Sequence, residues 1–390
     1  MSDAIPVNGE VLRWARESAG LTIDEVVQKM NRKRITYEMI ESWEQSFEAP
    51  TYSQLERLAY EVYKRPLAIF FFPEPPQEIT AKQSFRTLPE YEIQRMPVKM
   101  RFLLRKAQSF QLNLYDLYDG VNPSEKKITK DLGFSTHISA KEMSETVRQY
   151  INIDIETQNS FGDPENALKE WRKILEGFGL FIFKDAFQSD EFSGFCLYDD
   201  KFPVIYVNNS KPFTRQIFTL FHELAHLLFK TGGIDTKIED YLDYIDGDEE
   251  RIEIICNSFA GEFLVPSEHF CQKARGITVD DESISSLANI YHVSREVILR
   301  KFYDLDRIDQ DFYSKKVREW RMAESSASTG SGGNYYFTKG AYLGSKYIEK
   351  AFSQFYQNRI TTERLADYLG VKVKNISGME SQLYRMVSSA

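Results

Sequence analysis

The chain has 390 residues, more than one hydrophobic core usually holds, and this length predicts about two to four domains. Its hydrophobic fraction of 42% and charged fraction of 27% are typical of a folded protein and argue against extensive disorder. With 58 Asp and Glu against 49 Lys and Arg, the formal net charge is −9, so a contact with nucleic acid would require a local basic patch.

The cysteines and the first residues indicate the compartment. Cys196, Cys256 and Cys271 are odd in number and lack C-x-x-C spacing, which favours neither a disulfide framework nor a cysteine-rich zinc site. The start of the chain, MSDAIPVNGEVLRW, has no basic region followed by an apolar stretch, and no apolar run approaches the ~20 residues that cross a bilayer. We therefore expect a cytoplasmic protein with no membrane contact.

Short amphipathic helices are predicted through the first domain, residues 9–75. The apolar spacing indicates helices in VLRWARESA, in IDEVVQKM with Thr22 as its N-cap, in ITYEMIESWEQ and, after Pro50, in TYSQLERLAYEVY. The run Pro73-Glu74-Pro75-Pro76 cannot continue a helix and marks the end of this domain. Residues 76–135 follow as a helical connector.

The hydrophobic period changes in the centre of the chain, residues 136–275. Two helical patterns precede LFIFK (180–184), GFCLY (194–198) and PVIYVN (203–208), which are short, rich in aromatic and β-branched residues and separated by polar turns. They predict a small antiparallel sheet, in which PVIYVN is either an exposed edge open to a peptide or an interior strand. A helix then runs from Pro212 to Gly232-Gly233, and a second, EERIEIICNSFAGEFL, ends at Pro266.

The remainder is predicted to be helical on both sides of a linker. Residues 276–323 form a small helical unit, 324–334 (ESSASTGSGGN) a flexible linker, and 335–390 a C-terminal helical segment. A loose pattern recurs in RLAYEVYKRPLAIF (57–70), SLANIYHVSREVIL (286–299) and RLADYLGVKVKNI (364–376). Either small helix-turn-helix units of any purpose share such a pattern or the stretches are duplicates, and no function follows from it.

The helix after the sheet contains TLFHELAHLLF (219–229), with two histidines four positions apart. His222 and His226 then project from one face of the helix about one turn apart, where two imidazoles can bind one zinc ion. Glu223 is rotated from that face and can reach a water at the open coordination position. The alternative is a buried helix whose histidines are satisfied by hydrogen bonds, but burying these three groups among apolar side chains is costly unless a cation pairs with them.

A catalytic zinc usually has three protein ligands, so a third ligand must be found. His137, His269 and His292 occupy unpromising positions, which leaves Glu249, Glu250 and Glu253 of the next helix. Glu253 shares a face with Cys256, Asn257 and Ala260, whereas Glu249 and Glu250 lie in the first turn. Spacing favours Glu253 without deciding the choice.

The run F-T-x-x-H-E-L-A-H-L-L-F, followed by E-x-x-C-N-x-F-A-x-x-F-L-V-P, resembles the ImmA/IrrE family of zinc-dependent endopeptidases over roughly residues 140–270. The resemblance implies a zincin-like domain with one zinc ion per chain, held by His222, His226 and Glu253, and Glu223 as catalytic base. Cys256 replaces the alanine usual in that family. Asn257 either orients a ligand or is an ordinary buried asparagine.

Residues 9–72 resemble the XRE family of helix-turn-helix domains, through Arg16, the break Ala19-Gly20-Leu21-Thr22, Trp43-Glu44 and Pro50. The resemblance implies that the helix starting near Ile35 enters the major groove. The residues that would contact DNA are Arg32, Lys33, Arg34, Thr36 and Tyr37.

The acidic residues Glu38, Glu41 and Glu44 on the same helix oppose phosphate contact. Such domains also serve for dimerisation or protein docking, so DNA binding and protein binding both stay open, and so does a homodimer.

These patterns predict a predominantly helical α+β protein with an N-terminal helix-turn-helix bundle, a central protease domain and a helical C-terminal region. The resemblance implies a cytoplasmic zinc endopeptidase that cleaves a repressor or toxin-like partner in a stress-response, mobile-element or toxin-antitoxin setting. The alternative is a non-catalytic regulator or antitoxin in which zinc only stabilises the fold.

Overall fold

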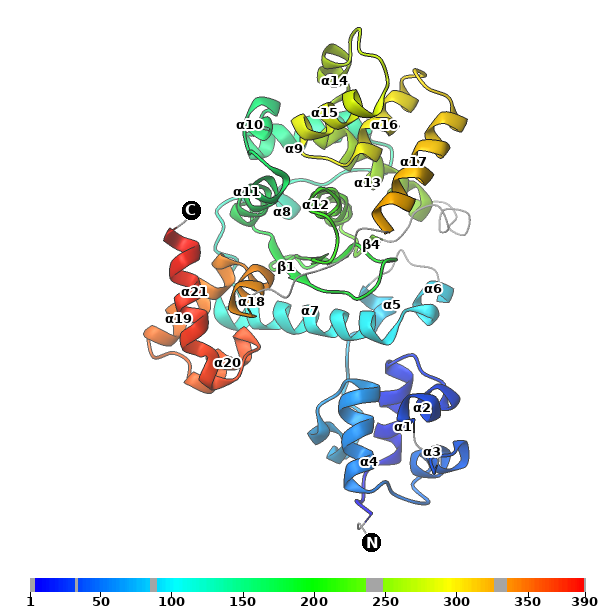
Figure 1. The fold of residues 1–390 in the computed structure, drawn as a ribbon. Coiled ribbons are helices and arrows are strands. Elements are labelled where there is room, and N and C mark those ends of the chain that lie inside the picture. The colour runs from blue at the N-terminus through cyan, green and yellow to red at the C-terminus, as the bar shows by residue number, and fades with distance from the viewer. Residues whose placement is uncertain (1–3, 32–33, 85–89, 236–247, 326–334, 389–390) are drawn as a thin grey trace. The chain divides into compact units, whose positions relative to one another are not determined.

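The computed structural model describes residues 4–31, 34–84, 90–235, 248–325 and 335–388, and it divides into two compact units, 1–108 and 109–390 (Figure 1). As predicted, the protein is predominantly helical with a small sheet. Among the described residues, no helix combines the length and the apolar character needed to cross a membrane.

The first unit is built from short capped helices around one core. Thr22 forms a capping box with Glu25, and Asn8 and Thr36 cap two further helices. The core includes Val11, Ile40, Trp43, Leu55 and Phe70. The helices of this unit are α1 (Gly9–Ser18), α2 (Ile23–Met30), α3 (Tyr37–Glu44), α4 (Tyr52–Arg57), a π-helix (Leu58–Tyr63), a 3₁₀ helix (Leu67–Phe71), α5 (Ala81–Ser84), α6 (Glu90–Arg95) and the first part of α7 (Val98–Leu117).

Glu44 at the end of α3 points into this core. Its Oε1 lies 2.7 Å from Nε of Arg16, and Nη2 of Arg16 donates to its Oε2 at 2.9 Å. Glu44 is 6% exposed, so the pair is largely withdrawn from water. Arg16 and Trp43-Glu44, which carried the resemblance of this region, therefore hold α1 against α3.

The second unit contains a four-stranded sheet of order β1-β3-β2-β4, formed by β1 (Phe181–Asp185), β2 (Gly194–Leu197), β3 (Val204–Asn208) and β4 (Ile234–Asp235). β2 is antiparallel to β3 and β4, but β1 runs parallel to β3. The prediction of a purely antiparallel sheet was wrong. β1 and β2 follow one another in the sequence but are not neighbours in the sheet, because β3 lies between them.

The interior position of β3 decides between the two interpretations of PVIYVN. All five residues of β3 are buried, with β1 on one side and β2 on the other. An added peptide strand therefore cannot pair with β3.

Helices cover both faces of the sheet (Figure 1). On one face, α12 packs against β2 and β3, and α11 packs against β1. On the other face, Phe110 of α7 stacks on Phe183 of β1, with ring centroids 4.4 Å apart. Successive side chains of a strand therefore belong to opposite faces of the sheet, and Ile182 and Ile205 belong to the core on the α12 side.

A single hydrophobic core connects the elements from Ile128 to Val317. Trp171 of α11 contacts Phe221 of α12 and Phe263 of α13 edge-on within it. The helices concerned are α8 (Ile128–Asp131), α9 (Ala140–Ile151), α10 (Ile155–Asn159), α11 (Pro164–Gly177), α12 (Phe213–Leu228), α13 (Asp248–Leu264), α14 (Ser267–Lys273), α15 (Asp281–Tyr291), α16 (Arg295–Asp304) and α17 (Gln310–Ser325). Most of the predicted linker 324–334 lies outside the described residues.

The C-terminal helices dock against β1 and α7 of the same unit. Tyr347 packs edge-on against Phe183 and Phe110, and its hydroxyl donates to the carbonyl of Tyr368 at 3.1 Å. Arg172 of α11 donates to the carbonyl of Ala341 at 2.7 Å. These elements are α18 (Tyr335–Leu343), α19 (Ser345–Tyr356), α20 (Thr362–Leu369), a 3₁₀ turn (Val373–Asn375) and α21 (Ile376–Ser388).

Candidate metal centre

The candidate centre lies on two packed helices, α12 and α13. Every residue of α12 from Thr219 to Leu228 is buried, so its polar side chains are withdrawn from water together with its apolar ones. Leu220, Phe221 and Leu224 join the main core and anchor the helix. The apolar run around the two histidines thus holds them in a rigid element.

His222, His226 and Glu253 converge. Nε2 of His222 lies 3.3 Å from Oε1 of Glu253, and Nε2 of His226 lies 3.1 Å from Oε2 of the same carboxylate. The two Nε2 atoms are 3.1 Å apart. In the part of the chain that the structure describes, no other group of three His, Cys, Asp or Glu side chains offers ligand atoms this close together.

The opposite ring nitrogens are held by neighbouring side chains. Nδ1 of His222 lies 3.0 Å from Oδ1 of Asn257, whose Nδ2 donates to the carbonyl of Glu253 at 3.0 Å. Because the Asn257 oxygen can only accept, the proton of a neutral His222 belongs on Nδ1. For His226, Nδ1 lies 3.5 Å from Oγ1 of Thr231, which itself donates to the His226 carbonyl. Both Nε2 atoms are then left as acceptors.

Acceptor atoms therefore face one another at the centre of the cluster. Two imidazole nitrogens and two carboxylate oxygens at these separations repel unless a cation lies among them. Two nitrogens and one carboxylate form the kind of ligand set that catalytic zinc uses. The donor set and its orientation fit the zinc ion that the sequence predicted.

The ionisation of Glu253 depends on positive charge beside it. Burial alone would raise the pKa of its carboxyl, but when His222 and His226 are protonated, their charges and hydrogen bonds outweigh burial and hold that pKa well below its ordinary value. The side chain thus stays ionised although only 5% of the residue is exposed. An ionised carboxylate can bind a metal ion without first losing a proton.

Glu223 follows His222 on α12 and is fully buried. Its carboxylate neighbours the thiol of Cys196 on β2, and burial together with this charge raises the pKa of Cys196 well above the usual value. Burial and the charges of Glu253 and Glu223 raise the pKa of Cys256 in the same way. Both thiols therefore stay protonated and act as small neutral packing groups around the carboxylates.

At Gly233 the backbone passes close to the His226 ring, and the sequence patterns did not predict this contact. A Cβ atom at Gly233 would lie 2.5 Å from the His226 ring. The Gly233 N–H donates to Sγ of Cys196 at 3.3 Å, and its carbonyl accepts from the Cys196 N–H at 3.0 Å. In the sequence, Gly232-Gly233 indicated only the end of a helix. Because Gly233 has no side chain, its backbone can also lie against the imidazole of His226.

The other histidines are engaged elsewhere or exposed. His137 is exposed, Nδ1 of His269 lies 2.8 Å from the Tyr291 hydroxyl, and Nε2 of buried His292 contacts the carbonyl of Gly162. None of them joins the cluster of His222, His226 and Glu253. Their placement agrees with the choice of an acidic third ligand.

The residues predicted to contact DNA are only partly described. Arg32 and Lys33 lie outside the described residues, whereas Arg34 is exposed. Thr36 uses its hydroxyl to cap α3, accepting from the Met39 N–H at 3.4 Å, and Tyr37 is 42% exposed. These positions do not test DNA binding, but the burial of Glu44 removes one acidic side chain from the surface of α3.

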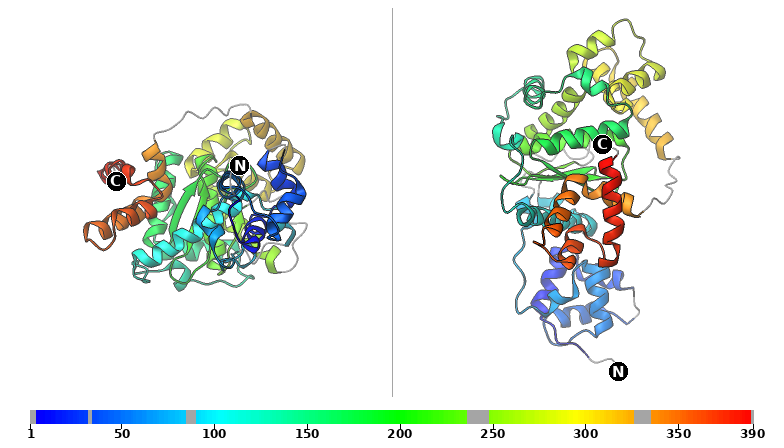
Figure 2. Two further views of the ribbon diagram at one scale, coloured as in Figure 1. Left: turned by 90° about the horizontal axis from the view of Figure 1, so that it is seen from below. Right: turned by 90° about the vertical axis from the view of Figure 1, so that its left-hand side faces the viewer.

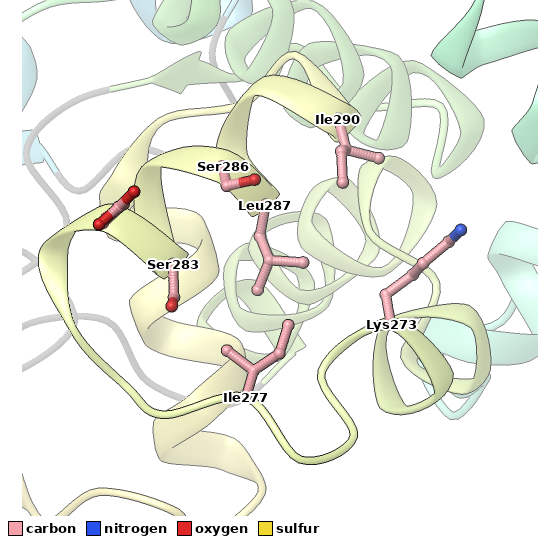
Figure 3. Close-up of a pocket in the computed structure, with 7 residues that line it drawn as sticks. Lys273, Ile277, Ser283, Ser286, Leu287 and Ile290 are labelled. Atoms are coloured by element: carbon pink, nitrogen blue, oxygen red, sulfur yellow. The ribbon is translucent and has the colours of Figure 1, made fainter.

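A separate surface pocket of about 300 Å³ lies at α14 and α15 (Figure 3). Ile277, Leu287 and Ile290 form its apolar side, and Lys273 lies at its rim. Because it contains none of the predicted site residues and most of its side chains are at least partly exposed, we assign it no role.

Comparison with known protein families gives a match over the region that contains His222, His226 and Glu253. Residues 175–303 match the family described as the IrrE N-terminal-like domain, a peptidase family. A stretch of 73 residues is 40% identical to the radiation response metalloprotease IrrE of Deinococcus deserti, covering 18% of this chain. The match spans about a quarter of that relative's length (25%). Residues 175–303 are therefore similar to an IrrE N-terminal-like domain, which confirms the resemblance to the ImmA/IrrE family that the two motifs predicted.

Proposed function

We propose that the protein is a zinc-dependent endopeptidase that hydrolyses peptide bonds in a narrow range of protein substrates. The observation that carries this proposal is the convergence of the ligand atoms of His222, His226 and Glu253, with the buried residue Glu223 adjacent to His222 on the same helix. The similarity to a metalloprotease over part of the chain supports the same reaction class.

The roles of the side chains follow from their positions. A zinc ion held by His222, His226 and Glu253 would supply an acidified water and polarise the scissile carbonyl. Glu223 accepts a proton at its carboxylate and returns it to the leaving amine. Asn257 holds His222 in the tautomer that presents Nε2 as a ligand atom.

The substrate that fits the rest of the chain is a regulatory protein, such as a repressor or a toxin-like partner. The N-terminal unit, as a helix-turn-helix module, would select a DNA site or a protein partner, with or without dimerisation. The matched relative is described as a radiation response protein, which supports a stress-response setting. In the first unit, Arg34 and Tyr37 are exposed, and Glu44 is neutralised by Arg16.

The test combines metal content with cleavage. Wild-type protein should contain about one zinc ion per chain and cleave a repressor encoded next to its own gene. Glu223→Gln should keep the zinc and lose about 10²–10⁴-fold in turnover, because it removes only the proton acceptor. His222→Ala and Glu253→Ala should lose both zinc and turnover.

A wild-type protein prepared with zinc that retains none would contradict the proposal. Glu250→Ala serves as a matched control, since Glu250 lies on the same helix but outside the cluster, and it should change neither zinc content nor cleavage.

A second candidate is a non-catalytic regulator or antitoxin with a structural zinc. The burial of the whole centre favours it, since His222 and Glu223 are 0% exposed and a catalytic zinc needs an open position. In that case Glu223→Gln should leave partner or DNA binding unchanged, while no candidate substrate is cleaved even by the wild-type protein.

A further inference from the structure

The helix that carries the two histidines turns a second face toward the sheet. α12 lies along one face of the sheet that contains β2 (Figure 2). A Cβ atom at Gly194 of β2 would lie 2.4 Å from Cγ2 of Thr219, so strand and helix are in close contact at this point. Thr219 and Glu223 are four residues apart and therefore share one face of the helix. The face of α12 that contacts Gly194 thus also contains Glu223.

Cys196 is placed on the strand to meet this face of the helix. Gly194 and Cys196 are two residues apart, and alternate residues of a strand lie on the same face of the sheet. Phe195 between them belongs to the opposite face, where its ring stacks on Tyr206 with centroids 5.1 Å apart. Cys196 joins the core on the α12 side and is 0% exposed. Its thiol therefore faces α12.

The Cys196 thiol and the Glu223 carboxylate are neighbours. Burial, the charge of Glu223 and a hydrogen bond with its side chain raise the pKa of the Cys196 thiol well above the usual value. The thiol therefore keeps its one proton and is a donor. A second acceptor, the carbonyl oxygen of Thr231, lies 3.9 Å from Sγ, which is a long separation even for sulfur. A charged carboxylate is the stronger acceptor of the two.

Backbone contacts hold Cys196 itself in place. The Gly233 N–H donates to Sγ at 3.3 Å, and the Cys196 N–H donates to the Gly233 carbonyl at 3.0 Å. Because Sγ accepts from Gly233, the thiol proton points away from that N–H. Gly233 in turn lies against the ring of His226. Cys196 is thus fixed between β2 and a segment that contacts a predicted metal ligand.

We propose that Cys196 is a positioning residue for Glu223, whose carboxylate it orients by donating its S–H proton to one of the two carboxylate oxygens. The inference rests on the proposed function, in which Glu223 is the proton acceptor. A carboxylate with one oxygen held in this way presents the other oxygen in a fixed direction. Direction matters because a proton is transferred only across hydrogen-bond distance. Cys196 acts through Glu223 and takes no part of its own in the proton transfer.

Infrared spectroscopy of the full-length protein tests the hydrogen bond without turnover. The S–H stretching band of Cys196 is identified by its loss in Cys196→Ser. It should move to higher frequency in Glu223→Gln, because an amide oxygen accepts more weakly than a carboxylate. The band of Cys271, which is exposed, is the internal control and should stay unchanged. A Cys196 band at the same frequency in the wild type and in Glu223→Gln would overturn the proposal.

Substitutions at Cys196 test the effect on turnover. Cys196→Ala removes the donor and should lower kcat about tenfold while KM and zinc content stay unchanged. Cys196→Ser keeps a donor at the same position and should retain most of kcat. Cys271→Ala is the control and should match the wild type. Thermal unfolding of each variant measures the loss of packing separately.

The kinetic outcomes separate this inference from the proposed function. A kcat of Cys196→Ala equal to that of the wild type would overturn the positioning role, and so would a Cys196→Ser variant as slow as Cys196→Ala. A wild-type protein that cleaves no substrate would instead contradict the proposed endopeptidase. In that case the infrared band still decides whether Cys196 donates to Glu223.

Discussion

The metal centre and the end of α3 both bury an acidic side chain, but for different reasons. Glu44 is satisfied within the protein, because the guanidinium of Arg16 donates to both of its oxygens. Glu253 faces two imidazole nitrogens whose protons belong on the opposite ring atoms. One carboxylate therefore stabilises a fold, and the surroundings of the other fit a cation. A buried charge indicates a ligand site only when the chain does not supply the matching donors.

The largest effect expected from this comparison is at Glu44. Glu44→Ala leaves Arg16 partly buried without its partner and should lower the free energy of unfolding by about 3 kcal/mol. Chemical denaturation measures this loss. Glu38→Ala, at an exposed position of the same helix, should stay within about 0.5 kcal/mol of the wild type. If both substitutions cost the same, Glu44 is not held by an internal ion pair.

A smaller effect is expected at Gly233. Gly233→Ala places a methyl group against the His226 ring and should destabilise the protein by about 1–3 kcal/mol while lowering its zinc content. The control is Gly261→Ala, because a Cβ at Gly261 in α13 would meet nothing within 4 Å. That substitution should raise stability by up to about 1 kcal/mol, since alanine favours a helix. Equal effects at the two glycines would show that the approach to His226 is unimportant.

The effect at Asn257 should be on metal binding more than on folding. Asn257→Ala removes the acceptor that orients His222 and should weaken zinc binding about 10–100-fold. Competition with a chelator measures this change. Asn257→Asp keeps an acceptor next to Nδ1 and should retain more of the affinity than alanine does. Unchanged affinity in both variants would make Asn257 an ordinary buried asparagine.

Much of this architecture could be predicted from local patterns. The helical period, the cap at Thr22 and the three central strands depend on neighbouring residues, and the structure contains them near the predicted positions. The order and direction of the strands could not be predicted, because strand pairing is decided by contacts between distant parts of the chain. β3 was thus left open as edge or interior and proved to be interior.

The sequence by itself determined that His222 and His226 share one helical face, because a spacing of four residues is nearly one turn. It also named Glu253 as the favoured third ligand, through helical phase and a family resemblance. Only the tertiary structure shows that this carboxylate lies next to the two imidazoles. It also shows that Asn257 contacts Nδ1 of His222 and that Gly233 lies against the His226 ring. It also turned Glu44 inward. These outcomes depend on how helices pack, and packing is decided by contacts that no single stretch of sequence contains.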